Sequence, residues 1–259
     1  MTIRKILKYI LLKLFKKNSI FIKNLSLIEN SYLLLKKINS KYSIILIPII
    51  IKSLFFIIKN RENIFSNKKK LFFEKKYKFI YGDWFSNNIY IWEKFIKKIR
   101  NINYLEIGAF EGRSTVFISE LKNTKSIKTV DTWKGSDEHN KVSFTKVFKN
   151  FKKNIKSTKK NNINFFKETS DEFFKKNKSY YNLIYIDGSH EYSQVKKDFE
   201  NSFYFLEKNG YLICDDFNWF FYEDIDKNPH KAIIECYEKY KKNLNIKFLN
   251  HQVIFEKIN

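Results

Sequence analysis

The sequence is poor in the residues that form turns, disulfides and metal clusters. Its 259 residues include six glycines, two prolines and two cysteines. Cys214 and Cys236 each lack a second cysteine at metal-ligand or redox spacing. We therefore expect neither a disulfide framework nor a zinc site, and a reducing, cytoplasmic compartment. Alanine occurs only at Ala109 and Ala232, so no Ala-x-Ala cleavage site follows the amino terminus.

Acidic residues are also scarce, because 27 Asp and Glu face 50 Lys and Arg, for a net charge of +23. The excess is uneven. Residues 1–80 carry 19 basic and 3 acidic residues, and residues 81–259 carry 31 and 24. A basic surface attracts nucleic acid, but most of this charge lies outside the region that carries the motifs described below. We therefore do not expect nucleic acid to be the partner.

Residues 1–80 predict a basic, apolar helical extension ahead of a domain at 81–259. "MTIRKILKYILLKLFKK" places apolar residues at helical spacing with lysines opposite, which indicates a helix that packs on protein or lies on an anionic membrane. Pro48 and Lys52 divide the apolar run at 43–58, which is shorter than the roughly 20 residues of a spanning helix. We expect residues 1–60 to contact the inner membrane face or a second copy of the chain.

Five of the six glycines lie between residues 101 and 216, near the ends of predicted strands. The first two occur in "YLEIGAFEGRST", where a short strand ends at Gly108 and Ser114 is placed to cap the following helix. The Gly-x-x-x-Gly spacing, through Gly112, differs from the pattern of dinucleotide-binding loops. Glu106 at the strand tip would repel a pyrophosphate and suits a cofactor with ammonium and sulfonium charge.

The next strand, in "KSIKTVDTWKG", ends at Asp131, 23 residues after Gly108. An acidic residue about 20 residues past the loop can accept both hydroxyls of an adenosine ribose. The alternative is a turn or a helix cap. We include Thr132 beside it in the cofactor set. Ser170, after a third strand, stands where an adenine edge would be met, and is equally a helix N-cap.

Two further strands end in acidic residues. "YNLIYIDGSHEY" ends at Asp187, with His190 three residues later, and "GYLICDDF" ends at Asp215 and Asp216. In open α/β sheets, ligands gather at the carboxyl ends of the strands. Three carboxylates at one edge would suit Mg²⁺ or Mn²⁺, and His190 could take a proton from a hydroxyl. A structural role for His190 and Asp216 in capping remains the alternative.

The order of these elements predicts a doubly wound, mostly parallel Rossmann-like sheet of seven strands. A helix at 89–99 leads into the first strand, and the helix after Asp187 is expected to stop at Gly210. The last two strands, "NIKFLN" and "HQVIFEKI", turn around Asn250 and His251 and form an antiparallel terminal hairpin.

These motifs resemble class I S-adenosylmethionine-dependent methyltransferases. Within that class, the sequence is most similar to small-molecule O-methyltransferases related to macrocin O-methyltransferase and to cephalosporin-biosynthesis methyltransferases, whose relatives occur in bacterial surface-glycan gene clusters. The resemblance covers residues 81–259 and rests on "YLEIGAFEGRST", "VDTWKG", "YIDGSHEYSQVKKDF" and "GYLICDDFNW". It implies O-methylation of a sugar, a glycan or a similar polar small molecule.

The resemblance also implies roles for individual residues. Glu106, Gly108 and Gly112 would form the wall against the methionine part, and Asp131 would hold the ribose. Asp187, Asp215 and Asp216 would bind a divalent cation, with His190 near the acceptor hydroxyl. Ser114 and Asp187 complete the cofactor set. Catechol-type relatives have Asp-Asn where this chain has Asp215-Asp216, which puts the metal ligands in doubt.

Three other functions stay open at this level. One is a nicotinamide-dependent oxidoreductase, which the missing third loop glycine disfavours. Another is an RNA-binding protein or RNA methyltransferase. The Pro-Pro loop typical of base N-methyltransferases is absent, since the only prolines are Pro48 and Pro229. The third is an inactive interaction module, which the acidic strand tips disfavour.

Overall fold

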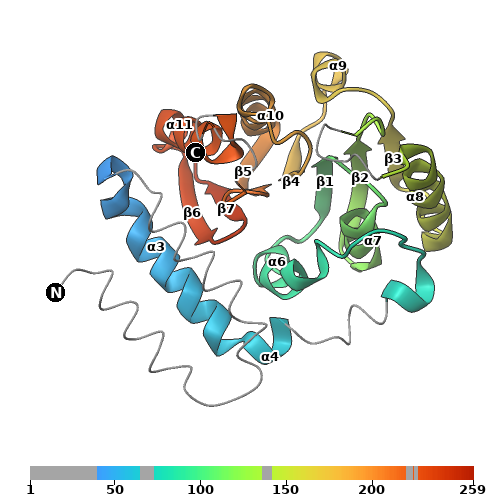
Figure 1. The fold of residues 1–259 in the computed structure, drawn as a ribbon, viewed down its shortest axis with the longest axis horizontal. Helices are drawn as coiled ribbons and strands as arrows, with labels where there is room; N and C mark the ends of the chain where they lie inside the picture. Colours follow the sequence, from blue (N-terminus) through green and yellow to red (C-terminus); the bar gives the residue numbers. More distant parts are fainter. Residues whose placement is uncertain (1–39, 65–72, 136–141, 220–223, 225–226) are drawn as a thin grey trace.

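The computed structural model describes residues 40–64, 73–135, 142–219, 224 and 227–259. These residues contain one seven-stranded sheet with the strand order β3-β2-β1-β4-β5-β7-β6 (Figure 1). Five strands are parallel: β1 (Ile102–Ile107), β2 (Thr124–Val130), β3 (Ile163–Phe166), β4 (Tyr181–Ile186) and β5 (Leu206–Cys214). The hairpin of β6 (Leu244–Leu249) and β7 (Val253–Lys257) adds antiparallel strands. The predicted Rossmann-like architecture is confirmed.

Helices cover both faces of the sheet (Figure 1). One face carries α6 (Ile89–Ile96), preceded by the short helix η1 (Ser86–Asn88), and α7 (Arg113–Glu120), and α8 (Phe144–Thr158) packs beside α7. The other face carries α9 (Ser170–Lys176), α10 (Tyr192–Phe205) and α11 (Pro229–Tyr240). Strand side chains alternate between two apolar cores: Leu105 and Ile107 face α10, whereas Ile102 and Tyr104 face α6 and α7.

The described part of the amino-terminal extension packs on the domain. Helix α3 (Ser40–Lys59), followed by α4 (Arg61–Ile64), lies against β6, where the Ser53 hydroxyl accepts a hydrogen bond from the Leu249 amide at 2.9 Å. Ile45 and Phe55 remain exposed on α3. None of the helices in the described ranges combines the length and apolar character needed to cross a membrane. The basic helix predicted at the amino terminus lies outside the described residues.

Three predicted helix boundaries are wrong. Helix α10 ends at Phe205, and Gly210 lies inside β5, where a Cβ would stand 3.1 Å from Asn182 Cα in the neighbouring strand. The N-cap of α7 is Gly112, because the Ser114 hydroxyl is used by Glu106. The N-cap of α9 is Thr169, which forms a capping box with Glu172.

Parallel pairing brings the strand ends to one edge. The backbone amide of Gly108 donates to Val130, that of Asp187 donates to Ile107, and that of Asp215 donates to Ile186. The sheet order reverses between β1 and β4, since β2 and β5 continue in opposite directions from this pair. Such a reversal opens a crevice at the carboxyl ends of the strands, and the glycine loop and acidic residues surround it.

A buried acid in α10 gives the stability of the protein a pH dependence. Asp198 is 1% exposed and accepts a hydrogen bond from Gln194. Burial raises its pKa to about 6, so the stabilisation from the neutral acid is complete below about pH 4 and is lost as the pH rises through 6.

We predict that Asp198→Asn, which cannot ionise, becomes more stable than the native protein as the pH rises from 4 to 8. At pH 8 the gain approaches about 3 kcal/mol, at about 1.4 kcal/mol per pKa unit. Urea unfolding at several pH values measures this difference. A gain that does not change with pH would show that Asp198 ionises normally.

Candidate active site

The glycine loop lies directly against the end of β4. Gly108 has a φ of 90°, and a Cβ there would stand 1.9 Å from the carbonyl oxygen of Asp187. Gly112 has a φ of 81°, and its Cβ would stand 2.9 Å from the Phe151 ring. Both positions therefore require glycine for backbone conformation and for space. The loop brings the start of α7 close to the tips of β1 and β4.

Glu106, near the end of β1, anchors the start of α7 after the glycine loop through hydrogen bonds. Its side chain is fully buried, and hydroxyl groups donate hydrogen bonds to both carboxylate oxygens. These donors are Tyr104 at 3.1 Å, Thr129 at 2.8 Å, Ser114 and Thr115. Burial raises the pKa of Glu106, and the four hydrogen bonds oppose that rise. The carboxylate ties β1 and β2 to α7, and it is enclosed rather than presented to the crevice.

Asp131 lies at the tip of β2, as predicted, and holds the glycine loop from the side. Its Oδ2 accepts hydrogen bonds from the amides of Ala109 and Phe110, both at 2.9 Å, and its Oδ1 accepts one from the Trp133 amide at 2.6 Å. The hydroxyl of Thr132 accepts from the Lys134 amide. The structure thus shows the turn role for Asp131, and ribose binding stays a prediction.

Two of the three acidic residues at the tips of β4 and β5, Asp187 and Asp215, contact the same tyrosine. The Tyr185 hydroxyl bonds Asp187 Oδ2 at 2.8 Å and also Asp215 Oδ2. One hydroxyl carries one proton, so the second contact requires a proton on a carboxyl group. Burial, followed by the charges of Asp215 and Asp216, raises the pKa of Asp187 well above its usual range. Burial and Asp216 likewise raise the pKa of Asp215.

Two histidines lie within ion-pair distance of the Asp216 carboxylate. His190 Nε2 lies 2.8 Å from Asp216 Oδ2, and His251 Nε2 lies 3.3 Å from Asp216 Oδ1 and 3.3 Å from Asp215 Oδ1. Burial alone would raise the pKa of Asp216, but the hydrogen bonds from both histidines lower it. Burial also lowers the pKa of His251, yet the two carboxylates outweigh it and raise that pKa to about 9.

The three predicted metal ligands, Asp187, Asp215 and Asp216, do not form one group among the described residues but divide between two overlapping groups, each of which includes a histidine. In one, Asp187, His190 and Asp216 bring their ligand atoms within 4.8 Å of one another, and in the other Asp215, Asp216 and His251 do so. Asp216 is common to both, whereas Asp187 and Asp215 are bridged by Tyr185. Each group mixes carboxylate oxygens with an imidazole nitrogen, a donor set that suits Mn²⁺ better than Mg²⁺.

Comparison with known proteins identifies the central segment. Residues 105–217, from β1 to the loop after β5, match the model of a family described as a methyltransferase domain. This segment is therefore similar to methyltransferase domains. A curated relative, an uncharacterized protein of Acanthamoeba polyphaga mimivirus, is 25% identical over 150 residues, which span 55% of this chain and 66% of the relative. This chain therefore spans just under two thirds of that relative.

Several solved structures share the fold of this chain at low sequence identity. A putative caffeoyl-CoA O-methyltransferase from Staphylococcus aureus is 16% identical, with a TM-score of 0.53, covering 81% of this chain and 100% of the other. MycE from the mycinamycin biosynthetic pathway, in complex with Mg and SAH, is 16% identical, with a TM-score of 0.50, and the match covers 75% of this chain and 54% of MycE. A putative rRNA methylase from Clostridium thermocellum is 13% identical, with a TM-score of 0.50, and the match covers 66% of this chain and 96% of the other. The fold is that of class I S-adenosylmethionine-dependent methyltransferases.

The residues around the methyltransferase crevice fit S-adenosylmethionine by their chemistry, and the crevice is narrow. A cavity of about 50 Å³ is lined by Gly108, Phe110, Ser114, Asp187 and part of the segment at 79–85. Trp84 of that segment is 64% exposed and packs on Phe110 at 5.3 Å between ring centroids. Ligand sites usually measure about 300–1,000 Å³, so S-adenosylmethionine binding requires Trp84 and Phe110 to separate.

Ser170 and two aromatic residues that follow β5 make contacts within the protein. Ser170, assigned to the adenine edge, accepts a hydrogen bond from Gln194 of α10 at 3.1 Å. Phe217 is buried in the core, and Trp219 stands beside the His190 ring with centroids 4.7 Å apart.

Sequence reasoning missed the residues that β7 contributes to the methyltransferase site. Gln252 donates from Nε2 to Asp215 Oδ2 at 2.7 Å and accepts from the Trp92 indole at 2.8 Å. His251 precedes it in the hairpin turn. The sequence carries no motif for them, because the register of β7 against β5, with Val253 opposite Cys214, is what places the residues just before Val253 beside Asp215.

We predict that Tyr185→Phe lowers the unfolding free energy by about 1–3 kcal/mol, because it leaves two buried carboxyl groups without their shared partner. Tyr211→Phe in β5 is the matched control. It removes a hydroxyl bonded to Glu256, which also pairs with Lys247, and should cost less than about 1 kcal/mol. Urea unfolding compares the two variants, and equal losses would contradict a special role for the Tyr185 hydroxyl.

Proposed function

We propose that the protein is an O-methyltransferase that methylates a hydroxyl of a sugar, a glycan or a similar polar small molecule. The supporting observation is the pair formed by His190 and Asp216 at 2.8 Å, beside Asp187 and next to the glycine loop. An aliphatic hydroxyl does not ionise at neutral pH, so its methylation requires a base or a metal ion. This pair can supply the base.

Different residues around the crevice would act on the acceptor and on the cofactor. Asp216 accepts the Nε2–H of His190, which leaves Nδ1, a buried atom in this structure, as the nitrogen that would take the acceptor's proton. When bound, S-adenosylmethionine supplies a methyl group whose bond electrons remain on sulfur as the acceptor oxygen attacks. The glycine loop, Ser114 and Asp187 would bind its methionine part, and Asp131 its ribose. Trp84 and Phe110 cover the crevice and exclude water.

The surroundings of His190 favour a polar acceptor. Charged groups of β4, β5 and the hairpin turn form one side, and Trp219 forms a flat apolar wall beside the imidazole. Carboxylates next to an aromatic ring suit a sugar, which has hydroxyl groups on its edges and apolar C–H faces.

We further propose assistance by a divalent cation held by Asp216 together with Asp215 and His251, the group that does not use His190 as a ligand. A bound cation would lower the pKa of the acceptor hydroxyl and orient it. Peripheral membrane contact or self-association through the amino-terminal region also remains a proposal. An RNA acceptor is the second candidate, supported by the basic composition and by the similarity in fold to a putative rRNA methylase.

We predict separable effects of two substitutions. His190→Ala should reduce turnover by about 10²- to 10⁴-fold and leave S-adenosylmethionine binding intact, because the base acts on the acceptor. Asp131→Ala should weaken S-adenosylmethionine binding by about 10- to 100-fold, through the loss of charge-assisted hydrogen bonds. Calorimetric titration measures binding, and transfer of labelled methyl to a panel of sugars measures turnover.

Asp171→Ala on the surface of α9 is the control and should change neither quantity. Normal turnover by His190→Ala would refute the mechanism. Methyl transfer to RNA but not to sugars would replace the proposed acceptor with the second candidate.

A further inference from the structure

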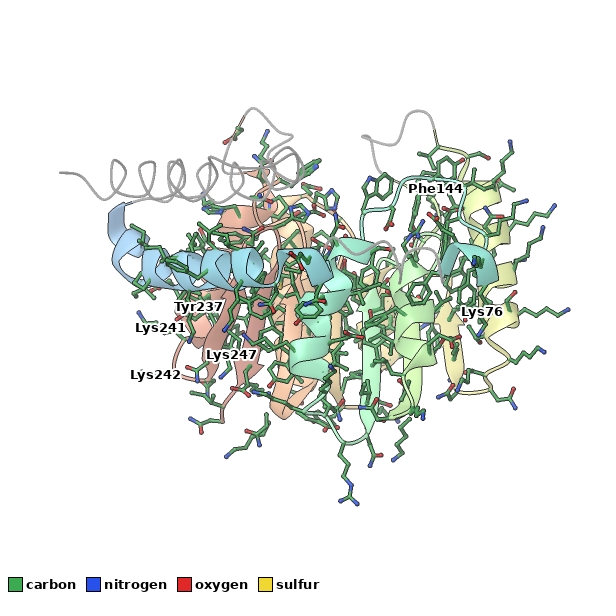
Figure 2. All side chains as sticks on the ribbon, turned by 90° about the horizontal axis from the view of Figure 1, so that it is seen from below. Lys76, Phe144, Tyr237, Lys241, Lys242 and Lys247 are labelled. Carbon is green, nitrogen blue, oxygen red and sulfur yellow. The ribbon has the colours of Figure 1, made fainter. Side chains whose placement is uncertain are left out.

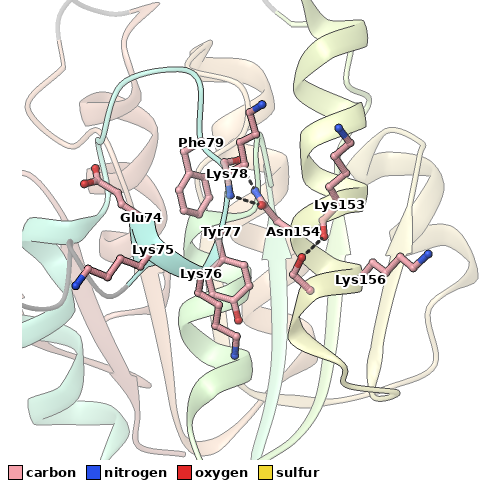
Figure 3. Close-up of a pocket in the computed structure, with 10 residues that line it drawn as sticks. Glu74, Lys75, Lys76, Tyr77, Lys78, Phe79, Lys153, Asn154 and Lys156 are labelled. Carbon is pink, nitrogen blue, oxygen red and sulfur yellow. Dashed lines mark hydrogen bonds between the residues drawn. The ribbon is translucent and has the colours of Figure 1, made fainter.

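A basic groove lies on the flank of the domain that carries α8. Its volume is about 830 Å³, within the usual range of ligand sites. One wall is the segment with Lys75, Lys76 and Lys78, and the other is the α8 face with Lys153 and Lys156 (Figure 3). Lys76 lies at the opposite end of the molecule from the second lysine group, Lys241, Lys242 and Lys247 (Figure 2).

The two walls are fixed to each other by a buried side chain. Asn154, 1% exposed, accepts from the Lys78 amide at 2.8 Å and donates to the Lys78 carbonyl at 3.0 Å and the Glu111 carbonyl at 2.9 Å (Figure 3). Glu111 in turn accepts from the amides of Ile80 and Tyr81 and from Asn150. The lysine backbones are therefore held in place before any ligand arrives, which lowers the entropy cost of binding.

The positive charge in the groove is largely uncompensated. Lys76 pairs with Glu120 at 2.6 Å. Lys75, Lys78, Lys153 and Lys156 are exposed and form no ion pair with any residue that the structure describes. Glu74 is the single acidic residue of the lining. These lysines place positive charge on both walls, which would attract a ligand with several linked acidic groups.

The form of the groove selects among polyanions. Tyr77 is buried and one face of the Phe79 ring is covered by the Arg113 guanidinium at 3.9 Å, so the lining offers little aromatic surface on which a nucleic-acid base could stack. Phe79 also lines the cavity next to the glycine loop, so the groove adjoins the methyltransferase crevice.

We infer that this groove binds an acidic oligosaccharide through its carboxylate or phosphate groups. The inference rests on the proposed function in one respect, the choice of a sugar chain as the carrier of the acidic groups. Since no methyl transfer is involved, binding can be measured without S-adenosylmethionine or turnover, and its outcome does not depend on that of the enzymatic test.

The test uses fluorescence anisotropy with two labelled probes, an oligogalacturonate and a phosphomannan fragment, on the full chain. Lys78→Gln combined with Lys153→Gln should weaken binding of at least one probe by about tenfold, and added salt should weaken it further. Lys146→Gln combined with Lys149→Gln removes the same charge from α8 outside the groove. This control should stay within about twofold of the native protein, and circular dichroism verifies the fold of both variants.

Three results would overturn the inference. The first is the absence of binding to either probe. The second is an equal loss in the two double variants, which would indicate attraction by net charge alone. The third is tighter, groove-dependent binding of a single-stranded oligonucleotide or of anionic phospholipid vesicles, which would assign the groove to nucleic acid or to a membrane surface.

Discussion

The site depends on the electrostatic balance of three carboxylates held at neighbouring strand ends. Parallel pairing of β4 with β5 places Asp187 next to Asp215 and Asp216, and all three side chains are partly buried. Like charges this close are unfavourable in a medium of low polarity. The protein offsets them with the Tyr185 hydroxyl, the Gln252 amide and two imidazoles. Nearly every polar contact of the site serves this balance.

The backbone conformation of Asp216 also helps to place its carboxylate between the two imidazoles. Asp216 adopts a left-handed conformation with a φ of 56°, which carboxylate residues tolerate better than most. Its amide donates to Asp215 Oδ1 at 2.9 Å. In this conformation one carboxylate reaches both His190 and His251. The strained position thus connects the β4 loop to the terminal hairpin, and it sets the direction of the proposed catalytic imidazole.

Much of the fold could be predicted from the sequence, because apolar strands and scarce glycines mark the strand ends. Gly108 and Asp187 were placed correctly at one edge, since parallel strands leave no other arrangement. Helix ends were less predictable. Ser114 has the chemistry of a helix cap, and its hydroxyl instead bonds a glutamate eight residues earlier, a choice that depends on how α7 packs over β1.

The contribution of the terminal hairpin shows the other limit. His251 and Gln252 have no motif of their own, and only the register of β7 against β5 brings them to Asp215. The same holds for the groove formed by the segment around Lys78 and helix α8, which lie 76 residues apart at their Asn154 contact. Sites assembled by long-range packing require coordinates, whereas sites at the end of one strand can be recognised from sequence.

The central claim is that the glycine loop and the acidic strand ends form one site for an adenosyl donor. A crystal structure of the protein with S-adenosylhomocysteine tests it most directly. The account predicts the nucleoside between the glycine loop and Asp131, the sulfur facing the side of Asp187 and His190, and Trp84 moved away from Phe110. A ligand bound elsewhere, or a crevice still closed by Trp84 at saturating ligand, would contradict it.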